Sequence, residues 1–406
     1  MKWPTILIAT LFLYSSGLFA QTTGNSLPGK NLPSTYPLAN SQPGNTLSGN
    51  VTDSATGKPL AGVSVFLNNT SHGTVTRADG SFLLRDIPKG SYQVVFTAIG
   101  YATAIADIDG SRLPSALKVI LHPRAIELAA VTVEPYEKNG WGRWGKFFVE
   151  NFIGTGENAS SCSIRNRNVL RFHYSKRSNR LLVTATEPLL VENNALGYVL
   201  EYQLEQFAAD LNAKIVTYFG YPFFQEMTPA KESRRIKWRT GRRTAYTGSM
   251  MHFMRSLYAG NSIKEGFFAE RRVTVPNEEK IRVKDLYRPD FQKPGQFPMD
   301  TLYYFWEVLR QPNMITRMLI MPADSILTTH EDGRRHLFFE GQLTVVYGVN
   351  ERSGEFRSSE IRLLNPVPIT VEENGNYYPP QILLSSGFWG RSEKISNLLP
   401  LDYEPD

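Results

Sequence analysis

The chain of 406 residues contains a single cysteine, Cys162, and no apolar run long enough to cross a membrane as a helix. One cysteine cannot form a disulfide within the chain, and Cys162 lies too far from the N-terminus to carry a lipid there. The most apolar stretch, Ile6–Tyr14, is shorter than the roughly 18 residues that a spanning helix needs. These absences exclude a disulfide-stapled domain and a polytopic helical membrane protein. We interpret Cys162 as a small buried hydrophobe.

The sequence also lacks the common motifs of hydrolytic enzymes. None of its six histidines is followed by glutamate three positions later, and neither His-Glu-x-x-His nor Gly-x-Ser-x-Gly occurs. Ser249 and His252 lie three residues apart in a predicted helix, but no acid stands nearby in the sequence to orient the imidazole. We therefore place this pair on a helix surface, and we predict no catalytic residue, no metal ligand and no cofactor.

Two further histidines, His330 and His336, flank the dipeptide Asp332-Gly333, which is typical of a hairpin turn. The expected register pairs His330 with Arg335 and places His336 one position further along the strand. Because successive side chains of a strand point to opposite faces, this register separates the two imidazoles. We therefore expect no metal site at this hairpin.

Positive charge is concentrated in the middle of the chain, although the net charge is only +6. Residues 162–273 contain 18 Lys and Arg against 9 Asp and Glu, whereas residues 274–406 contain 14 against 19. The densest segment, Lys231–Arg243, holds seven positive charges and one negative charge in thirteen residues. Its candidate anion-binding residues are Arg234, Arg235, Lys237, Trp238, Arg239, Arg242 and Arg243.

Two interpretations of Lys231–Arg243 remain open. Its cations can dock on an anionic partner such as lipopolysaccharide, phospholipid headgroups or an acidic glycan. Alternatively, the segment is a solvent-exposed hairpin whose arginines pair with the acidic C-terminal part of the chain.

The start of the chain has the pattern of an export signal followed by a tether. The apolar run Ile6–Tyr14 is followed by small residues up to Ala20, as in a secretory signal peptide that is cleaved after this alanine. We therefore predict an exported protein of the periplasm, outer membrane or cell surface, for which nucleic acid is not a partner. Residues 21–45 are rich in Gly, Pro, Ser, Thr and Asn and have almost no charge, which predicts a disordered tether.

Apolar residues at every second position begin after Thr46 and predict a small sandwich of antiparallel strands. The predicted strands are 47–52, 62–68, 73–77, 81–85, 91–98, 101–107 and 116–121. The Asp79-Gly80 pair supplies the positive φ that a tight hairpin turn requires. We interpret Asp53 and Asp79 as turn residues rather than calcium ligands.

Several short motifs occur in order along this predicted sandwich. They include Gly49-Asn50-Val51-Thr52-Asp53, Thr56-Gly57-Lys58-Pro59-Leu60-Ala61-Gly62-Val63, Asp79-Gly80-Ser81-Phe82 and Ile99-Gly100-Tyr101. Together they resemble the carboxypeptidase regulatory-like module over about residues 46–122. The resemblance implies a transthyretin-like β-sandwich, common in exported proteins and outer-membrane receptors of Bacteroidetes-type bacteria. It implies no catalysis, because the module accompanies other domains in that family.

The larger second part of the chain has weaker patterns. Apolar residues alternate at Leu170–Tyr174, Tyr198–Leu204 and Leu343–Tyr347, which is typical of antiparallel sheet with one solvated face. Helical spacing of apolar residues predicts one helix between Arg242 and Tyr258 with its apolar stripe in the core. A second helix is predicted over Arg391–Leu399.

The sequence as a whole predicts a mainly β protein, with a seven-stranded sandwich followed by a larger β-rich domain with one or two helices. The predicted parts are a signal peptide at 1–20, a tether at 21–45, the sandwich at 46–123, a linker at 124–145 and the β-rich domain at 146–406.

Export and the absence of catalytic motifs favour a non-catalytic cell-envelope protein with a binding or assembly role. Its expected partners are envelope glycan, lipopolysaccharide or outer-membrane proteins, with peripheral association at the membrane. Two alternatives remain open: a hydrolase whose site is assembled from dispersed residues of 146–406, and a small outer-membrane β-barrel.

Overall fold

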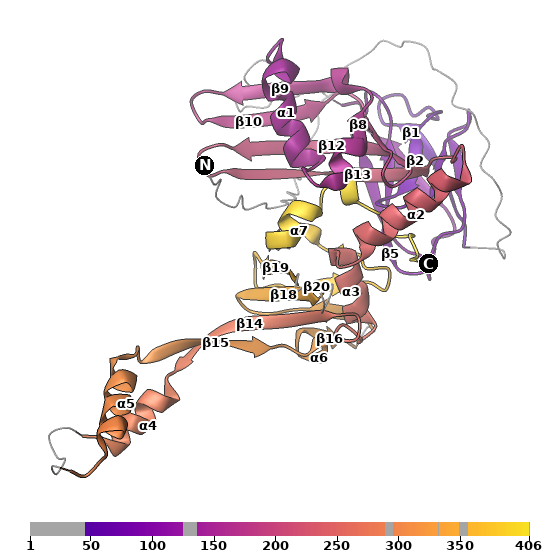
Figure 1. Ribbon diagram of the computed structural model, residues 1–406. Helices are drawn as coiled ribbons and strands as arrows, with labels where there is room; N and C mark the ends of the chain where they lie inside the picture. Colours follow the sequence, from indigo (N-terminus) through magenta and orange to yellow (C-terminus); the bar gives the residue numbers. More distant parts are fainter. Residues whose placement is uncertain (1–44, 125–135, 289–294, 332, 349–355, 406) are drawn as a thin grey trace.

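The computed structural model describes residues 45–124, 136–288, 295–331, 333–348 and 356–405. The predicted signal peptide and residues 21–44 of the predicted tether lie outside the described residues, as do residues 125–135 of the predicted linker. An N-terminal sandwich packs beside two further sheet-containing bodies, and a long arm projects from the second body (Figure 1).

Seven strands form the N-terminal sandwich, which confirms the fold predicted from the alternating residues. They are β1 (Leu47–Asp53), β2 (Ser64–Leu67), β3 (Gly73–Val75), β4 (Ser81–Leu84), β5 (Ser91–Thr97), β6 (Ala104–Asp109) and β7 (Leu117–Leu121). Two sheets, ordered β4-β1-β7 and β3-β2-β5-β6, enclose a core that includes Val51, Val65, Phe82 and Phe96. The prediction of purely antiparallel strands is wrong for one pair. β7 returns from the opposite sheet by a crossover and runs parallel to β1.

The first body is a six-stranded sheet with one long helix, α1 (Gly140–Phe152), which begins inside the predicted linker. Its strands are β8 (Cys162–Ile164), β9 (Leu170–Ser175), β10 (Arg180–Ala185), β11 (Leu189–Asn193), β12 (Tyr198–Asp210) and β13 (Ile215–Glu226), with 3-10 turns η1 (Glu157–Ser161) and η2 (Arg167–Val169). Phe148 and Phe152 of α1 are fully buried against Phe172, Tyr202 and Phe207 of the sheet. The apolar alternation in β9 and β12 was predicted, whereas the helix that its buried face packs against, α1, was not.

The second body combines a five-stranded sheet with a small four-stranded sheet. The larger sheet is ordered β15 (Met314–Ile320), β14 (Phe267–Pro276), β18 (Gln342–Gly348), β19 (Phe356–Leu363) and β22 (Leu383–Ser386). The smaller is ordered β16 (Leu327–Thr329), β17 (Arg335–Leu337), β20 (Ile369–Val371) and β21 (Tyr377–Tyr378). Helix α3 (Met250–Tyr258) buries Phe253, Met254 and Leu257 in this core, together with Trp389. The short elements α6 (Ala323–Ile326) and η4 (Pro380–Ile382) complete the body.

The helix predicted over Arg242–Tyr258 is in fact two helices. They are α2 (Glu232–Tyr246) and α3, separated by three residues. Gly248 in the gap has a φ of 76°, which breaks the helix, and the side chain of Ser249 then caps α3 by accepting the backbone N–H of His252 at 3.1 Å. A single helix was therefore the wrong prediction, although the apolar stripe does lie in the core.

The helix predicted over Arg391–Leu399 is also wrong in its bounds. The chain forms α7 (Gly387–Ser392) and a 3-10 turn, η5 (Ile395–Asn397). The backbone of Lys394 between them is extended and interrupts the helix. Two residues later, the N–H of Ser396 donates to the carbonyl of Ile153 at 3.0 Å. Within the residues that the structure describes, no helix combines the length and the apolar character needed to cross a bilayer.

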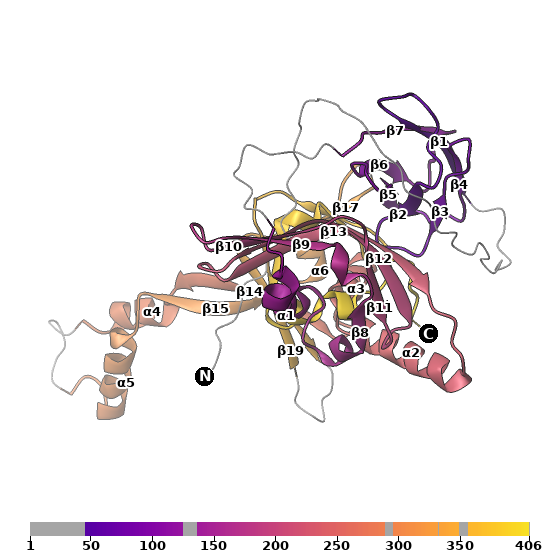
Figure 2. The same cartoon turned by 90° about the horizontal axis from the view of Figure 1, so that it is seen from above.

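The sandwich is docked on the first body rather than separated from it (Figure 2). Phe66 and Val95 of the sandwich form a buried cluster with Tyr221 and Phe223 of β13. Backbone hydrogen bonds join the same surfaces, because the N–H of Phe224 donates to the carbonyl of Thr70 at 3.0 Å. The sandwich and β13 thus share a small apolar interface.

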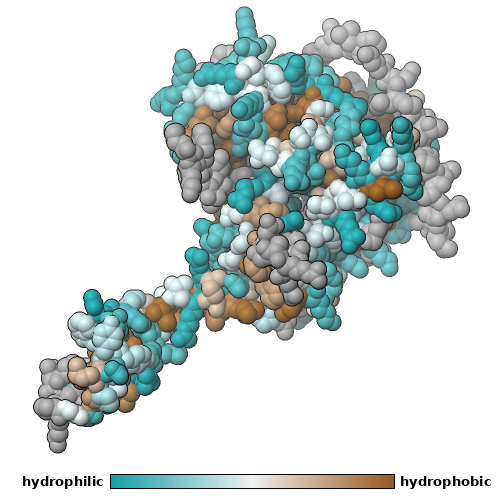
Figure 3. Space-filling view, in the orientation of Figure 1, coloured by the Kyte–Doolittle hydropathy of each residue, from teal (hydrophilic) through white to brown (hydrophobic). Residues whose placement is uncertain are grey.

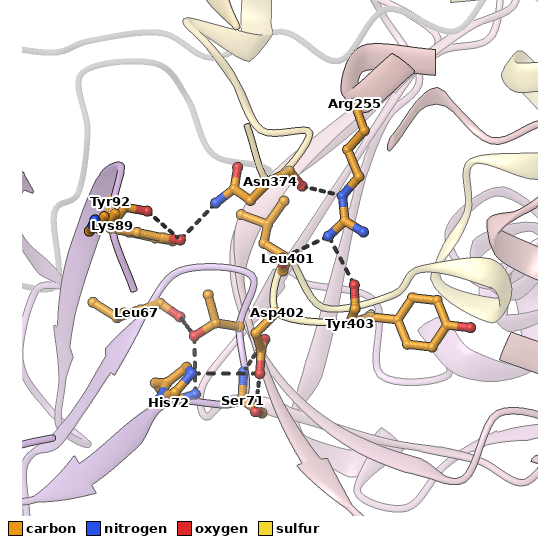
Figure 4. Close-up of polar contacts among 11 residues, drawn as sticks. Leu67, Ser71, His72, Lys89, Tyr92, Arg255, Asn374, Leu401, Asp402 and Tyr403 are labelled. Atoms are coloured by element: carbon orange, nitrogen blue, oxygen red, sulfur yellow. Dashed lines mark hydrogen bonds and ion pairs between the residues drawn. The ribbon is translucent and has the colours of Figure 1, made fainter. Parts of the chain in front are cut away.

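The C-terminal segment, residues 393–405, contacts both the sandwich and the second body (Figure 4). Arg255 of α3 donates to the carbonyls of Leu401 and Tyr403 at 3.1 and 2.9 Å, and to that of Asn374 at 2.9 Å. The side-chain amide of Asn374 donates in turn to the hydroxyl of Tyr92 in the sandwich at 2.8 Å. Residues from three parts of the chain therefore meet in one polar network.

Candidate functional site

The predicted anion-binding segment lies on α2, so the hairpin interpretation is wrong. One face of this helix packs on the turn between β11 and β12, where the indole of Trp238 donates to the carbonyl of Asn194 at 2.9 Å. Four positions later, Arg242 donates to the carbonyl of Leu196 at 2.7 Å and pairs with Glu226 at 2.6 Å. Residues four apart share a helix face, which explains why both meet the same turn. Trp238 and Arg242 therefore hold the helix in place.

The other cations of α2 are exposed at the surface. They are Arg234, Arg235, Lys237, Arg239 and Arg243. Arg235 pairs with Glu232 of the same helix at 2.7 Å. Neither Glu232 nor Glu226 belongs to the acidic C-terminal part, so the predicted ion-pair partner is wrong for Arg235 and Arg242. The helix leaves a basic surface, which we call the α2 basic surface, made of these five exposed residues.

Ser249 and His252 do not form a catalytic dyad, and the prediction that they lie on a helix surface is wrong, because both are buried. The serine hydroxyl accepts a backbone N–H, while the imidazole Nδ1 accepts the N–H of Gly248 at 3.1 Å. The Nε2 atom lies 3.2 Å from Glu265, so the prediction that no acid lies near this imidazole is wrong. Because Nδ1 is an acceptor, the ring proton lies on Nε2 and is directed at Glu265. Burial lowers the pKa of His252 and keeps the ring neutral, so this pair gives no support to the hydrolase alternative.

The register predicted for the His330 and His336 hairpin is wrong by one residue. β16 and β17 pair Thr329 with Arg335 and Thr328 with His336. The two imidazoles therefore lie near each other, with ring centroids 4.3 Å apart, instead of on opposite faces. Among the residues that the structure describes, no three His, Cys, Asp or Glu side chains gather into a group that could hold a metal.

Asp53 and Cys162 both have contacts that stabilise the fold. Asp53 accepts the backbone N–H groups of Ala55 and Thr56 at 2.6 and 3.0 Å and the hydroxyl of Tyr101 at 2.6 Å, as a turn residue does. Cys162 packs beside the core of the first body, and burial raises the pKa of its thiol to about 12. A thiol of such high pKa is a poor nucleophile.

The feature that sequence reasoning missed is the arm. β14 and β15 pair over Glu270–Pro276 and Met314–Ile320, but β18 pairs with β14 only up to Arg271. Beyond that point the two strands leave the sheet as a ribbon and end in two helices, α4 (Glu278–Leu286) and α5 (Met299–Arg310) (Figure 1). A two-stranded ribbon is at best marginally stable alone, so the helical tip must supply part of its stability.

The tip has a small core and a polar clamp at its base. Val283, Phe305 and Val308 are buried between the two helices. Asn277 is 2% exposed and its side-chain carbonyl caps α4 by accepting the N–H of Lys280 at 3.1 Å, while its amide donates to Gln311 at 3.0 Å. These hydrogen bonds join Asn277, which precedes α4, to Gln311, which follows α5.

The opposite side of α5 presents large apolar side chains to solvent. Met299, Tyr303 and Trp306 are 79%, 66% and 59% exposed. Their spacing of four and three residues places them in one row along the helix. Arg310 extends the row, with its guanidinium 5.0 Å from the centroid of the Trp306 ring. We call these four residues the arm row. Figure 3 shows apolar residues exposed along the arm and at its tip.

A signal for this row was present in the sequence. Residues 299–310 have the apolar content of a helix whose two faces are both apolar, and Pro298 before them is a signal for the start of a helix. One face fills the tip core with Phe305 and Val308, and the other is surplus to folding. Exposed apolar side chains gathered in one row are a candidate interaction surface.

Comparison with known proteins identifies the sandwich. Residues 47–133 match the CarboxypepD_reg-like domain family. The N-terminal sandwich is a CarboxypepD_reg-like domain. The match covers only this segment, and the two bodies and the arm lie outside it. No curated protein matches the chain.

Solved structures add little to this family match. A chain of a type II cohesin–X-dockerin complex from Acetivibrio cellulolyticus has 18% identity over 29% of this chain and 80% of its own, with a TM-score of 0.19. A putative membrane-associated protein of unknown function from Bacteroides fragilis has 10% identity over 84% of this chain and 96% of its own, with a TM-score of 0.15. At such TM-scores neither structure establishes a shared fold.

Proposed function

We propose that the protein is an exported, non-catalytic protein of the cell envelope with a binding or assembly role, and that the arm is its docking element. The observation that supports this proposal is the exposed arm row at the point furthest from the packed bodies. Aromatic residues, Met and Arg are enriched at the centres of protein interfaces and dominate their binding energy. The CarboxypepD_reg-like domain and the predicted export signal are in keeping with an envelope location.

A protein partner suits the tip better than an anionic lipid surface. Helix α4 carries three acidic and three basic residues, and α5 carries two acidic and one basic. Binding to anionic lipid is strengthened by an excess of Lys and Arg around the apolar face, which these helices lack. We therefore propose that the arm row docks on an apolar surface of an outer-membrane protein.

The test places a photocrosslinking amino acid at position 303 in cells that produce the full chain. We expect a light-dependent adduct with a protein of the envelope. The matched control places the same amino acid at Ile99, which is 72% exposed on the sandwich and far from the arm, and we expect no such adduct there. The absence of an adduct at position 303, or an adduct only with a second copy of the chain, would overturn the proposal.

Substitutions then measure the contribution of the arm row. The double variant Tyr303→Ser/Trp306→Ser removes two exposed rings that are outside the buried tip core. We expect at least about tenfold less partner in a pull-down, because loss of an interface hot spot costs about 2 kcal/mol or more. Ile99→Ser should have no effect. If wild-type protein bound protein-free anionic vesicles and the double variant did not, the partner would be lipid and our proposal would be wrong.

A further inference from the structure

A cavity of about 260 Å³ lies where the sandwich and the two bodies meet. Its wall combines the Asn68–Asn69 turn of the sandwich, part of β13, the start of α3 and residues 393–401 of the C-terminal segment. A single water molecule needs only about 10–15 Å³ of such space, so this cavity has room for a small organic molecule. Junctions between domains are common places for ligand sites.

The side chain of Lys394 lies on the cavity wall and is buried, and it has no anionic partner among the residues that the structure describes. The residue is 5% exposed, and its Nζ lies 5.4 Å from the centroid of the Tyr218 ring. Within the described part of the chain, no carboxylate forms an ion pair with this nitrogen, and the lowered pKa of Lys394 has desolvation by burial as its cause. Buried charges in proteins are normally paired, so an unpaired ammonium beside an open volume indicates a place for an anion.

Glu393, the acid next to Lys394 in the sequence, does not form an ion pair with its ammonium group. The carboxyl of Glu393 accepts the backbone N–H of Met250 at 3.3 Å. Burial raises its pKa to about 7 and lowers the pKa of Lys394 to about 8. Below pH 7 the wall therefore presents an ammonium and a protonated carboxyl, and both can donate hydrogen bonds to an anion.

The other titratable groups on the wall stay neutral at physiological pH. They are the hydroxyls of Tyr202, Tyr218 and Tyr377, and burial raises the pKa of each above its usual range. The rest of the wall is largely apolar and includes Met250, Leu383 and Trp389. A ligand with one charged end and an apolar or aromatic body matches this combination.

We propose that this cavity binds a small organic acid, whose single carboxylate forms a salt bridge with Lys394 and whose body packs on Tyr218, Tyr377 and Trp389. A doubly charged phosphate fits less well, because Glu393 gains its own negative charge as the pH rises. The site is independent of the arm row and does not rest on the proposed docking function.

The test is calorimetric titration of the purified protein at pH 6 with two probes, benzoate and phenylacetate. We expect saturable binding of at least one probe with a Kd below about 1 mM, and none of neutral benzamide. Lys394→Met keeps the length and apolar character of the side chain without the charge, and should weaken binding at least about tenfold. Lys146→Met, at a side chain that is 89% exposed on α1, is the matched control and should bind as the wild type does.

A second measurement separates loss of the site from loss of the fold. Lys394→Met removes an unpaired buried charge and should therefore unfold at a higher temperature than the wild type. Wild-type affinity for the probe should fall steadily between pH 6 and pH 9, as Glu393 ionises and Lys394 loses its proton. No saturable binding, equal binding of benzamide, or unchanged affinity in a folded Lys394→Met protein would each overturn the proposal. Probe binding should persist in Tyr303→Ser/Trp306→Ser, so failure of the arm proposal leaves this result unaffected.

Discussion

The side chain of Asp402 accepts the backbone N–H of Ser71 at 2.9 Å and so joins two residues that are 331 positions apart. It also accepts the hydroxyl of Ser71 and lies 3.7 Å from the imidazole of His72. The turn after β2 is thus held by nearly the last residues of the described chain. The C-terminal segment, which also lines the cavity, fixes the CarboxypepD_reg-like domain against the rest of the molecule.

We expect Asp402→Ala to loosen this domain without unfolding the two bodies. A hydrogen bond to a charged group contributes about 1.5–3 kcal/mol, and partial exposure at this site reduces the loss to about 1 kcal/mol. Urea unfolding followed by circular dichroism checks the value. Glu404→Gln, two residues away and with a side chain that is 83% exposed, is the control and should leave the midpoint unchanged. Equal loss in both variants would contradict a specific role for Asp402.

The pH dependence of stability should show a minimum between about pH 7 and pH 8. The folded-state pKa of Glu393 is raised to about 7, so the folded protein binds more protons than the unfolded chain and stability falls as pH rises from about 4.5 to 7. The pKa of Lys394 is lowered to about 8, so the unfolded chain binds more protons and stability rises from about pH 8 to 10. Each effect amounts to at most about 3 kcal/mol.

Single variants assign the two limbs of this profile. Glu393→Gln should flatten the fall below pH 7, and Lys394→Met should flatten the rise above pH 8. Urea midpoints at seven or eight pH values between about 5 and 10 measure both limbs. A profile that keeps both limbs in both variants would mean that other groups control the pH dependence.

The α2 basic surface should bind anionic glycan or lipopolysaccharide through its exposed cations. Lys237→Glu/Arg243→Glu reverses two exposed charges without touching Trp238 or Arg242, which hold the helix. We expect several-fold weaker binding at low salt, and weak binding by both proteins at about 1 M salt, where the screening length is about 3 Å. Lys146→Glu on α1 is the charge-matched control. Unchanged binding in the α2 variant would leave the helix a structural role only.

Local patterns predicted the sandwich because each of its strands and turns is marked by residues close together in the sequence. The alternation of Val63, Val65 and Leu67 and the Asp79-Gly80 turn need no distant partner to be recognised. The same holds for the buried faces of β9 and β12. These elements follow the period of two that burial on one face of a sheet imposes.

The cavity and the arm depend on contacts that no local pattern contains. Lys394 and Tyr218 are far apart in the sequence, and only the packing of the C-terminal segment on β13 brings them together. The polar segment for which a hairpin was one of two interpretations is a helix, and Trp238 and Arg242 hold it on the turn between β11 and β12. Tertiary contacts of this kind override the local signal.

Local helix propensity and the tertiary structure predict opposite effects of Gly248→Ala on the unfolding free energy. If residues 242–258 formed one helix, Gly248→Ala would stabilise the protein by about 1 kcal/mol, since alanine is the better helix former. In the structure this glycine has a φ of 76°, and a Cβ atom would lie 2.7 Å from the ring of Tyr347. A side chain there also disturbs the carbonyl of Gly248 itself, which accepts the indole N–H of Trp389 at 2.8 Å. We therefore expect Gly248→Ala to lower the unfolding free energy by about 2 kcal/mol, measured by urea denaturation.

Gly260→Ala is the matched control, because that glycine has a φ of 68° with nothing within 4 Å of the added atom. It should lose only the backbone part, about 1 kcal/mol, and equal losses in both variants would mean that the contact with Tyr347 contributes nothing.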